Sequence, residues 1–154
     1  MRSAREIIDG CLVWDNHGCM PLRPMDTSFL PQLARYRAAG FDHVSLNIGF
    51  GDDSIEQHVR MIASLRDWLA QRAAEFVLVR TVGDIELARA SGRLAVSFDI
   101  EGANAVANQI SLVQFYFDLG VRWMLLAYNR NNSAAGGCQD DDCGLTDFGR
   151  SLID

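Results

Sequence analysis

Short apolar runs alternate with amphipathic segments of helical length along most of the chain. The runs that predict strands lie at residues 11–14, 43–48, 76–79, 94–100 and 122–128. The segments that predict helices lie at residues 28–39, 54–73, 84–90 and 112–119, and from 146 onward. Strands that alternate with helices and are apolar nearly throughout are typical of a parallel sheet with helices packed on it. The pattern therefore predicts the α/β class.

Local signals set the ends of several of these helices. Ser54 and Gln57 form a capping box, and apolar residues follow it at spacings of three and four. Ser28 is expected to cap the helix that stops at Gly40, since glycine readily takes the left-handed conformation that ends a helix. Gly120 is expected to end another helix in the same way. The capping residues and the spacing of the apolar residues thus predict the same ends for these helices.

Two architectures fit this order of elements. An open, doubly wound sheet can be complete at 154 residues, whereas a (β/α)8 TIM-type barrel takes about 250 residues. Length alone favours the open sheet. The helix that starts at Thr146 has barely two turns when it reaches Asp154, and this abrupt end favours part of a barrel.

Composition excludes several functions. All 14 basic residues are arginine, so a lysine Schiff base, a phosphate-loop lysine and a carbamylated-lysine metal bridge are all excluded. The 20 acidic residues give a net charge of −6, which disfavours nucleic acid as a partner. No apolar run approaches the roughly 20 residues that span a bilayer, and the first residues do not resemble a secretory signal. We expect a cytoplasmic protein with no membrane partner.

Residues able to bind a metal or a substrate follow three of the predicted strands. His17 and Cys19 leave the first strand. Glu101 follows the strand at 94–100, and Tyr128 ends the last strand. The carboxyl ends of parallel strands meet at one edge, where α/β folds place their sites. Imidazole, thiolate and carboxylate groups are good zinc ligands, although each of these residues alone also fits an ordinary structural role.

Three further titratable residues are expected to take no part in such a site. Asp99 lies inside a strand and is expected to be structural, paired with Arg122 or another basic residue. His43 sits at a strand start. His58 lies on the long helix one position before Val59 of the apolar stripe, so we expect it to be exposed.

Four segments carry a family resemblance across nearly the whole chain. In order, they read VWDNHGCMP, SFDIEG, LGVRWMLLAYNRNN and GLTDFGRSLI. The sequence resembles the membrane (renal-type) dipeptidases, metal-dependent peptidases of the amidohydrolase superfamily. This resemblance implies a (β/α)8 barrel that holds two zinc ions and takes a dipeptide as substrate. It also implies that His17 is the metal ligand after the first strand and that Glu101 bridges the two ions.

Two positions depart from the family pattern. Cys19 stands where the family has the aspartate of a His-x-Asp pair, and a thiolate can replace a carboxylate on zinc. Tyr128 stands where many members have a substrate-contacting histidine, and its hydroxyl can donate to a developing oxyanion. The alternatives are a Cys19 that packs inertly beneath Met20 and Pro21, and a Tyr128 that only packs at the barrel mouth.

The remaining ligands that the resemblance implies, two histidines and an aspartate, are expected beyond Asp154. The chain is then the N-terminal half of a barrel, with no catalytic residue assigned and with the predicted site residues His17, Cys19 and Glu101 for zinc and Tyr128 for substrate. Alone it is expected to be inactive, whether it is a fragment or the product of a truncated gene. The alternative is a non-catalytic open α/β binding domain, or a degenerate half-barrel that pairs with a copy of itself or with a second chain.

One loop holds two cysteines around a run of aspartates. Cys138 and Cys143 flank Asp140, Asp141 and Asp142. A solvated acidic loop is the first interpretation. A metal site and a small disulfide are the alternatives, and a cytosolic setting disfavours the disulfide.

Overall fold

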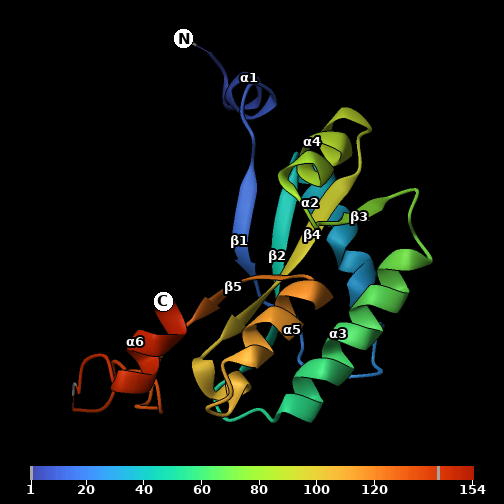
Figure 1. Ribbon diagram of the computed structural model, residues 1–154. Helices are drawn as coiled ribbons and strands as arrows, with labels where there is room; N and C mark the ends of the chain where they lie inside the picture. Colours follow the sequence, from blue (N-terminus) through green and yellow to red (C-terminus); the bar gives the residue numbers. More distant parts are fainter. Residues whose placement is uncertain (1, 142) are drawn as a thin grey trace.

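Five parallel strands form one sheet in the computed structural model, which describes residues 2–141 and 143–154 (Figure 1). The strands are β1 (Trp14–Gly18), β2 (His43–Phe50), β3 (Phe76–Leu78), β4 (Leu94–Glu101) and β5 (Val121–Leu125). β1 pairs with β2, and β2 pairs with β4. The other edge of β4 is shared, because β3 pairs with its first residues and β5 with its last.

This strand order distinguishes between the two predicted architectures. In a doubly wound sheet the order reverses at a switch point, whereas in a (β/α)8 barrel each strand lies beside the next. Here β1, β2, β4 and β5 are neighbours in chain order, and β3 is a short addition beside the start of β4. The chain therefore forms four successive strands of a barrel wall.

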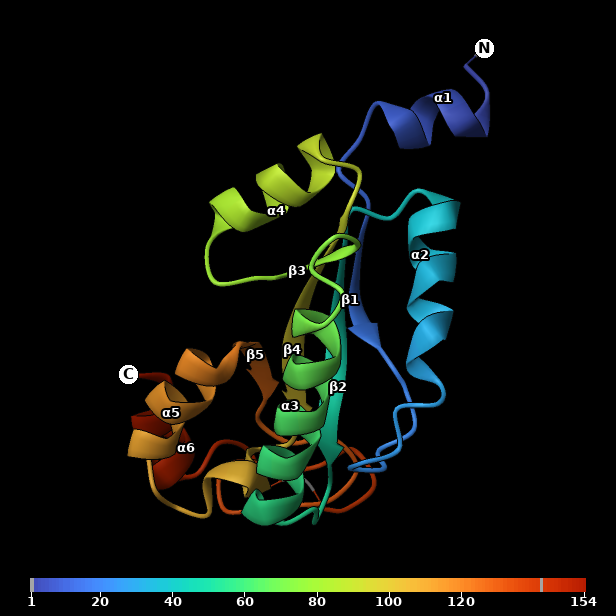
Figure 2. The same cartoon turned by 90° about the vertical axis from the view of Figure 1, so that its right-hand side faces the viewer.

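Helices connect these strands and flank them at both ends of the chain. The connecting helices are α2 (Leu33–Ala39), α3 (Ile55–Ala70), α4 (Val82–Ala90) and α5 (Ser111–Leu119). Figure 2 shows α1 (Ala4–Asp9) projecting beyond the start of β1, and α6 (Asp147–Ile153) follows the long segment after β5. Two 3-10 turns lie at Leu30–Gln32 and Ala103–Val106. None of the helices in the described part of the chain is long and apolar enough to cross a membrane.

Several helix ends are confirmed where the sequence predicts them. The Ser54 N–H donates to Oε1 of Gln57 (2.9 Å), and the Gln57 N–H donates to Oγ of Ser54 (3.2 Å). Gly40 and Gly120 end α2 and α5 with φ of 91° and 114°, which glycine adopts without a steric penalty. Thr146 caps α6 by accepting the Gly149 N–H at 2.9 Å.

The first predicted strand is misplaced. Pairing with β2 begins only at Trp14, opposite His43, so the apolar run at 11–13 forms the approach to the strand and Leu12 is exposed. β1 instead contains the polar residues 15–18, which the sequence pattern places after the strand, and His17 lies within it.

The helix predicted at 28–39 is also divided. Pro31 lacks an N–H group and falls in a separate 3-10 turn, and α2 begins only at Leu33. Ser28 caps no helix, because its hydroxyl donates to Oδ1 of Asp26 at 2.6 Å.

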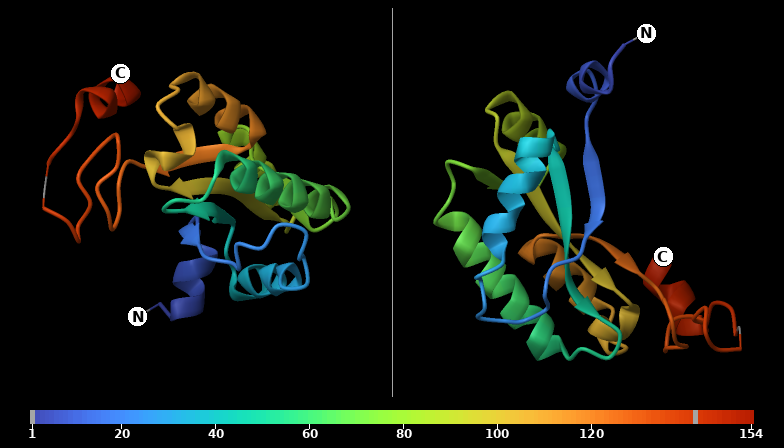
Figure 3. Two further views of the ribbon diagram at one scale, coloured as in Figure 1. Left: turned by 90° about the horizontal axis from the view of Figure 1, so that it is seen from below. Right: turned by 180° about the vertical axis from the view of Figure 1, so that it is seen from behind.

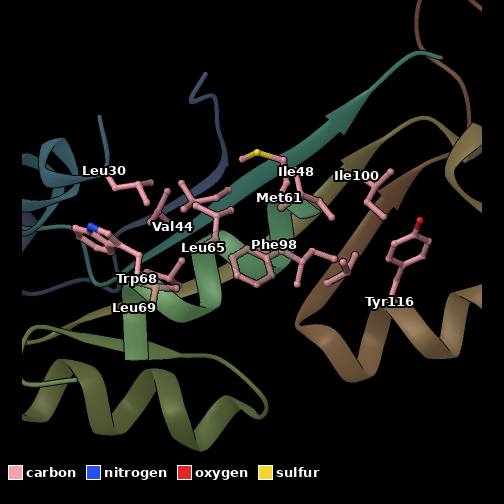
Figure 4. Packing of buried hydrophobic residues seen from close by; sticks show 14 of the residues in the cluster. Leu30, Val44, Ile48, Met61, Leu65, Trp68, Leu69, Phe98, Ile100 and Tyr116 are labelled. Carbon is pink, nitrogen blue, oxygen red and sulfur yellow. The ribbon is translucent and has the colours of Figure 1, made fainter. Parts of the chain in front are cut away.

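The main core lies between one face of the sheet and the helices α2, α3 and α5 (Figure 4). The strands contribute alternate residues, namely Val44, Leu46 and Ile48 from β2 and Val96, Phe98 and Ile100 from β4. The long helix α3 contributes Met61, Ile62, Leu65, Trp68 and Leu69. Because side chains alternate along a strand, this packing turns the intervening residues of β2 and β4 to the opposite face.

That opposite face is polar. The prediction that the strands are apolar nearly throughout is therefore wrong for this face. Its buried polar residues are His43, Ser45, Asn47, Ser97 and Asp99. At the strand starts, α4 packs on this face through Ile85 and Ala88 against Ala95. On this face, apolar residues of α4 cover the strand starts beside His43, and the surface from Ser97 to the carboxyl ends of the strands is polar. Figure 3 shows the segment after β5 extending past those ends.

Candidate metal centre

His17 lies near the end of β1, on a bulged segment. Asp15 pairs with Val44 and Gly18 with Leu46, so three residues of β1 advance beside two of β2. Such a bulge changes the direction in which a side chain points. Gly18 permits the close approach, because a Cβ at this position would lie 2.8 Å from Cγ2 of Val44.

A buried carboxylate orients the His17 ring. Nδ1 of His17 lies 2.9 Å from Oδ1 of Asp99, and an ionised carboxylate only accepts, so this contact places a proton on Nδ1; in a neutral ring the lone pair is then on Nε2. Asp99 also accepts from Oγ of Ser45 at 2.8 Å and from Nδ2 of Asn47 at 3.2 Å. The expected pairing of Asp99 with Arg122 is wrong, since Arg122 donates to backbone carbonyl groups.

The other two predicted ligands lie beside Nε2 of His17. Sγ of Cys19 and Oε2 of Glu101 are each 3.5 Å from this nitrogen. Ligands of a tetrahedral zinc ion are about 3.3–3.8 Å from one another, so both separations suit an ion shared with Nε2. Across residues 2–141 and 143–154, however, no group of three His, Cys, Asp or Glu side chains is arranged to hold a metal ion. The three predicted ligands are therefore neighbours around Nε2 of His17, and a metal ion there would need further ligands from elsewhere.

Negative charge accumulates at this end of the sheet. Partial burial, reinforced by the charges of Glu101, Asp99 and Asp15, raises the pKa of the Cys19 thiol. Burial also raises the pKa of Asp99, against the opposing effect of the hydrogen bonds that it accepts. A bound cation would act in the opposite direction and favour the thiolate. The chemistry of these donors therefore fits a divalent metal ion.

Trp123 joins β5 to the end of β1. Its Nε1 donates to the carbonyl oxygen of Asn16 at 2.8 Å, and its ring lies 5.5 Å from the His17 ring, centroid to centroid. Trp123 thus holds both the backbone beside His17 and one side of the imidazole.

The sequence interpretation missed the parts played by Asp99 and Trp123. A signal for Asp99 was available, because it stands two positions before Glu101 and residues two apart on a strand share a face. Nothing local marks Trp123, whose partner Asn16 is 107 positions away.

Tyr128 lies beyond the sheet, since β5 ends at Leu125 and the strand predicted at 122–128 is too long. Its side chain is 46% exposed and meets the Phe50 ring edge-on at 6.1 Å. Tyr128 and Glu101 line the same pocket of about 290 Å³. The polar side chains that share this pocket are Asp52, Asn104, Asn129, Arg130, Asn132 and Gln139. Tyr128, the predicted substrate contact, therefore lines the same pocket as Glu101, the predicted bridging ligand.

The other two histidines are both buried. The prediction that His58 is exposed is wrong, because only 1% of it is accessible. Its Nδ1 lies 2.8 Å from the carbonyl oxygen of Ser54, and its ring fills the space that a side chain at Gly49 would need. His43 contacts Oγ of Ser97 through Nε2 at 2.9 Å.

The loop between Cys138 and Cys143 contains free, exposed thiols and no disulfide. Asp140 forms an ion pair with Arg130 at 2.7 Å, so this part of the acidic loop is ordered by charge pairing. Asp142 lies outside the described residues.

Parallel strands that lie side by side in chain order, with candidate metal ligands at their carboxyl ends, place the chain in the class of (β/α)8-barrel proteins. Within this class, the chain belongs to the membrane dipeptidase family, peptidase family M19, whose sequence profile matches residues 27–154. The match begins after His17 and Cys19. The prediction that these two residues bind a metal therefore rests on the sequence resemblance and on their position in the fold.

Solved structures share this fold. An amidohydrolase from Pseudomonas aeruginosa superposes with a TM-score of 0.84 at 22% identity, over 99% of this chain and 45% of that one. A metallo peptidase from Rhodobacter sphaeroides, liganded with a phosphinate mimic of L-Ala-D-Ala, gives 0.75 at 19% identity, over 92% of this chain and 54% of that one.

A short stretch also matches a curated protein. An uncharacterized dipeptidase of Schizosaccharomyces pombe is 32% identical over 63 residues, which is 41% of this chain and 15% of that protein. The chain thus spans about half the length of the solved structures and less of this relative.

Proposed function

We propose that the complete protein hydrolyses dipeptides with zinc bound at the carboxyl ends of β1 and β4. One observation carries this proposal: Asp99 fixes the His17 ring so that Nε2 is directed to within 3.5 Å of both Cys19 and Glu101. The family supports a metal-dependent hydrolase, and the dipeptide mimic in the Rhodobacter sphaeroides structure supports a dipeptide as substrate.

Each residue at the centre has a distinct part in this proposal. His17, Cys19 and Glu101 hold zinc, and the family resemblance implies two ions with Glu101 between them. Zinc, when bound, lowers the pKa of a coordinated water towards about 7 and polarises the peptide carbonyl. Asp99 keeps the proton on Nδ1 of His17, so that Nε2 is free to bind the metal. A softer thiolate at position 19 biases the site towards zinc over harder ions.

The pocket beside Glu101 supplies the substrate site. Its volume of about 290 Å³ borders the predicted ligand, so a peptide bound there lies next to the metal. The Tyr128 hydroxyl donates a hydrogen bond to the carbonyl oxygen as negative charge develops on it. Asp52 and Arg130 line the same pocket with opposite charges, which suits a zwitterionic dipeptide.

Residues 1–154 alone are proposed to have no dipeptidase activity with added zinc. The described residues contain no complete group of three metal-binding side chains, and the chain spans about half of the solved barrels. Hydrolysis of simple dipeptides by the purified chain, abolished by a chelator, would contradict this part of the proposal.

A substitution at Glu101 in the full-length gene product tests the proposed activity. Glu101→Gln keeps the side-chain shape and removes the charge, so zinc content and turnover of L-Ala-D-Ala should both fall. Glu56→Gln is the matched control, because Glu56 is exposed on α3 and pairs only with Arg60. Two zinc ions per chain and unchanged turnover in Glu101→Gln would make Glu101 a structural acid.

A second candidate function is assembly with another chain. Each of the outer barrel strands, β1 and β5, pairs with one neighbour only among the described strands. Beside β5, Phe117 is 49% exposed and Val113 is 38% exposed, next to a hollow of about 110 Å³. Open strand edges and exposed apolar residues promote association. Gel filtration and a dipeptidase assay of the full-length product together distinguish the candidates, because an active monomer would contradict assembly and an inactive oligomer would contradict catalysis.

A further inference from the structure

A second polar pocket lies at the other end of the strands from the metal centre. It has a volume of about 230 Å³ and lies among α1, α2, the last turn of α4 and the starts of β2 and β4. Its charged lining residues are Arg5, Arg37, Arg89, Arg93, Asp9 and Asp42. Four of the 14 arginines but only two of the 20 acidic residues therefore line this pocket. Arg5 is paired with Asp9 at 2.9 Å, and the lining still has two more basic than acidic residues in a chain whose net charge is −6.

The four arginines come from different elements of the fold. Arg5 lies on α1, and Arg37 lies in the last turn of α2. Arg89 lies in the last turn of α4, and Arg93 directly precedes β4. Guanidinium groups therefore approach the pocket from several directions. Gly92 in its wall has φ of 68°, and a Cβ there would meet no atom within 4 Å, so no side chain fills this side.

The contacts that Arg89 makes to acceptors among the described residues are long. Its Nε lies 3.6 Å from Oδ1 of Asp42, and its Nη2 lies 3.5 Å from the carbonyl oxygen of Asp9. Both distances are at or beyond the limit of a useful hydrogen bond. Asp42 is also committed elsewhere, because its Oδ2 accepts the Val13 N–H at 2.8 Å. Arg89 therefore presents a charged group whose donors are largely unused.

Two neighbouring arginines also keep donors available. Arg93 donates through Nε to Oγ of Ser91 at 2.8 Å and through Nη1 to the carbonyl oxygen of Ala73 at 3.1 Å. Arg37 meets Glu75 through Nη2 at 3.3 Å. A guanidinium group has five N–H donors, so neither arginine is saturated by these contacts.

We propose that this pocket binds a phosphate group, either inorganic phosphate or the phosphate of a small monoester. A phosphate carries close to two negative charges and offers oxygens in a tetrahedral arrangement, which guanidinium groups from several directions can bind together. A planar carboxylate presents only two oxygens and would leave part of this array unused. The site lies away from the metal centre, so it adds a ligand that the proposed hydrolysis does not require.

Binding to the 154-residue chain tests this inference directly. Isothermal titration is carried out in EDTA, so that no metal ion can bind the anion, and at constant ionic strength with inorganic phosphate, glycerol phosphate and succinate. Phosphate or its monoester should bind at least several-fold more tightly than succinate. Arg89→Gln removes one charge-assisted contact and should weaken phosphate binding roughly tenfold.

The control for this variant is Arg60→Gln, which removes the same charge from the exposed face of α3 and should leave phosphate binding unchanged. If Arg89→Gln does not fold, Arg93→Gln provides the same comparison. Tighter binding of glycerol phosphate than of inorganic phosphate would assign the pocket to a phosphorylated metabolite, and the reverse order would assign it to free phosphate. Undetectable phosphate binding, or equal binding by the pocket variants and Arg60→Gln, would overturn the proposal. The proposed hydrolysis is untouched by either result.

Discussion

Replacing Asp99 with asparagine removes a buried charge but leaves its hydrogen bonds possible. In the wild-type protein Oδ1 accepts from His17 and Asn47, and Oδ2 accepts from Ser45. An asparagine oxygen can keep the first two contacts. The new amide nitrogen then faces Ser45, whose hydroxyl can rotate and accept. Asp99→Asn should therefore keep the orientation of His17 while it changes the charge behind the ring.

The two consequences of this substitution have opposite directions. Without metal, the variant no longer buries a carboxylate, so its free energy of unfolding should equal or exceed that of the wild type. Zinc affinity should fall by about 10–100-fold, as is usual when the partner of a ligating histidine is altered. Asp99→Ala differs, because it leaves the buried donors of Ser45 and Asn47 unsatisfied. At about 1–3 kcal/mol each, this should cost about 2–6 kcal/mol.

Two assays on the same variants separate these effects. Urea denaturation of the metal-free chains gives the free energies of unfolding, with the expected order Asp99→Asn at or above wild type and Asp99→Ala well below it. Competition for zinc against a chromophoric chelator gives the affinities, with both variants below wild type. The reasoning is refuted if Asp99→Asn destabilises the chain as much as Asp99→Ala does, or if neither variant weakens zinc binding.

Three further predictions concern metal choice, acid stability and packing. Cys19→Asp should shift the metal preference from zinc towards manganese in a competition assay, and zinc should protect the wild-type Cys19 thiol from alkylation. An unchanged metal preference together with no protection would mean that Cys19 is not a ligand. Burial lowers the pKa of His43 to about 4, below the 6.5 of an unperturbed histidine, so the unfolded state binds the extra proton between these values. The free energy of unfolding should therefore fall on acidification through this window by up to about 1.4 kcal/mol per pH unit, and the fall should be smaller in His43→Gln. Gly49→Ala places a Cβ 2.0 Å from Nε2 of buried His58 and should cost at least about 1–3 kcal/mol in urea, whereas little change would show that the ring can move.

The parts of the fold that depend on neighbours in sequence were predictable. The capping box at Ser54 and the stop at Gly120 are confirmed because each depends on residues within one helical turn. The start of β1 was not predictable in this way. A strand begins where a partner is available, and β2 offers none before His43, so the apolar run at 11–13 carries no strand.

The sequence predicts the candidate ligands of the site better than the residues that hold those ligands in place. The positions of His17 and Glu101 at strand ends follow from the alternation of strands and helices, and the structure brings their side chains within 3.5 Å of each other. The bond from Asp99 to His17 spans 82 positions, and that from Trp123 to Asn16 spans 107. Pairings of this kind are decided by strand register and bulges, which the local pattern does not specify.

The absorption spectrum of the full-length gene product with cobalt(II) tests most directly whether His17, Cys19 and Glu101 hold a metal together. Cobalt takes the place of zinc in such sites, and a bound thiolate gives a ligand-to-metal charge-transfer band. The account predicts a band that is lost in Cys19→Ser, weakened in His17→Ala and in Glu101→Gln, and retained in the control Cys138→Ser. A band that survives in Cys19→Ser but disappears in Cys138→Ser, or no cobalt-dependent band in the full-length wild-type protein, would contradict it.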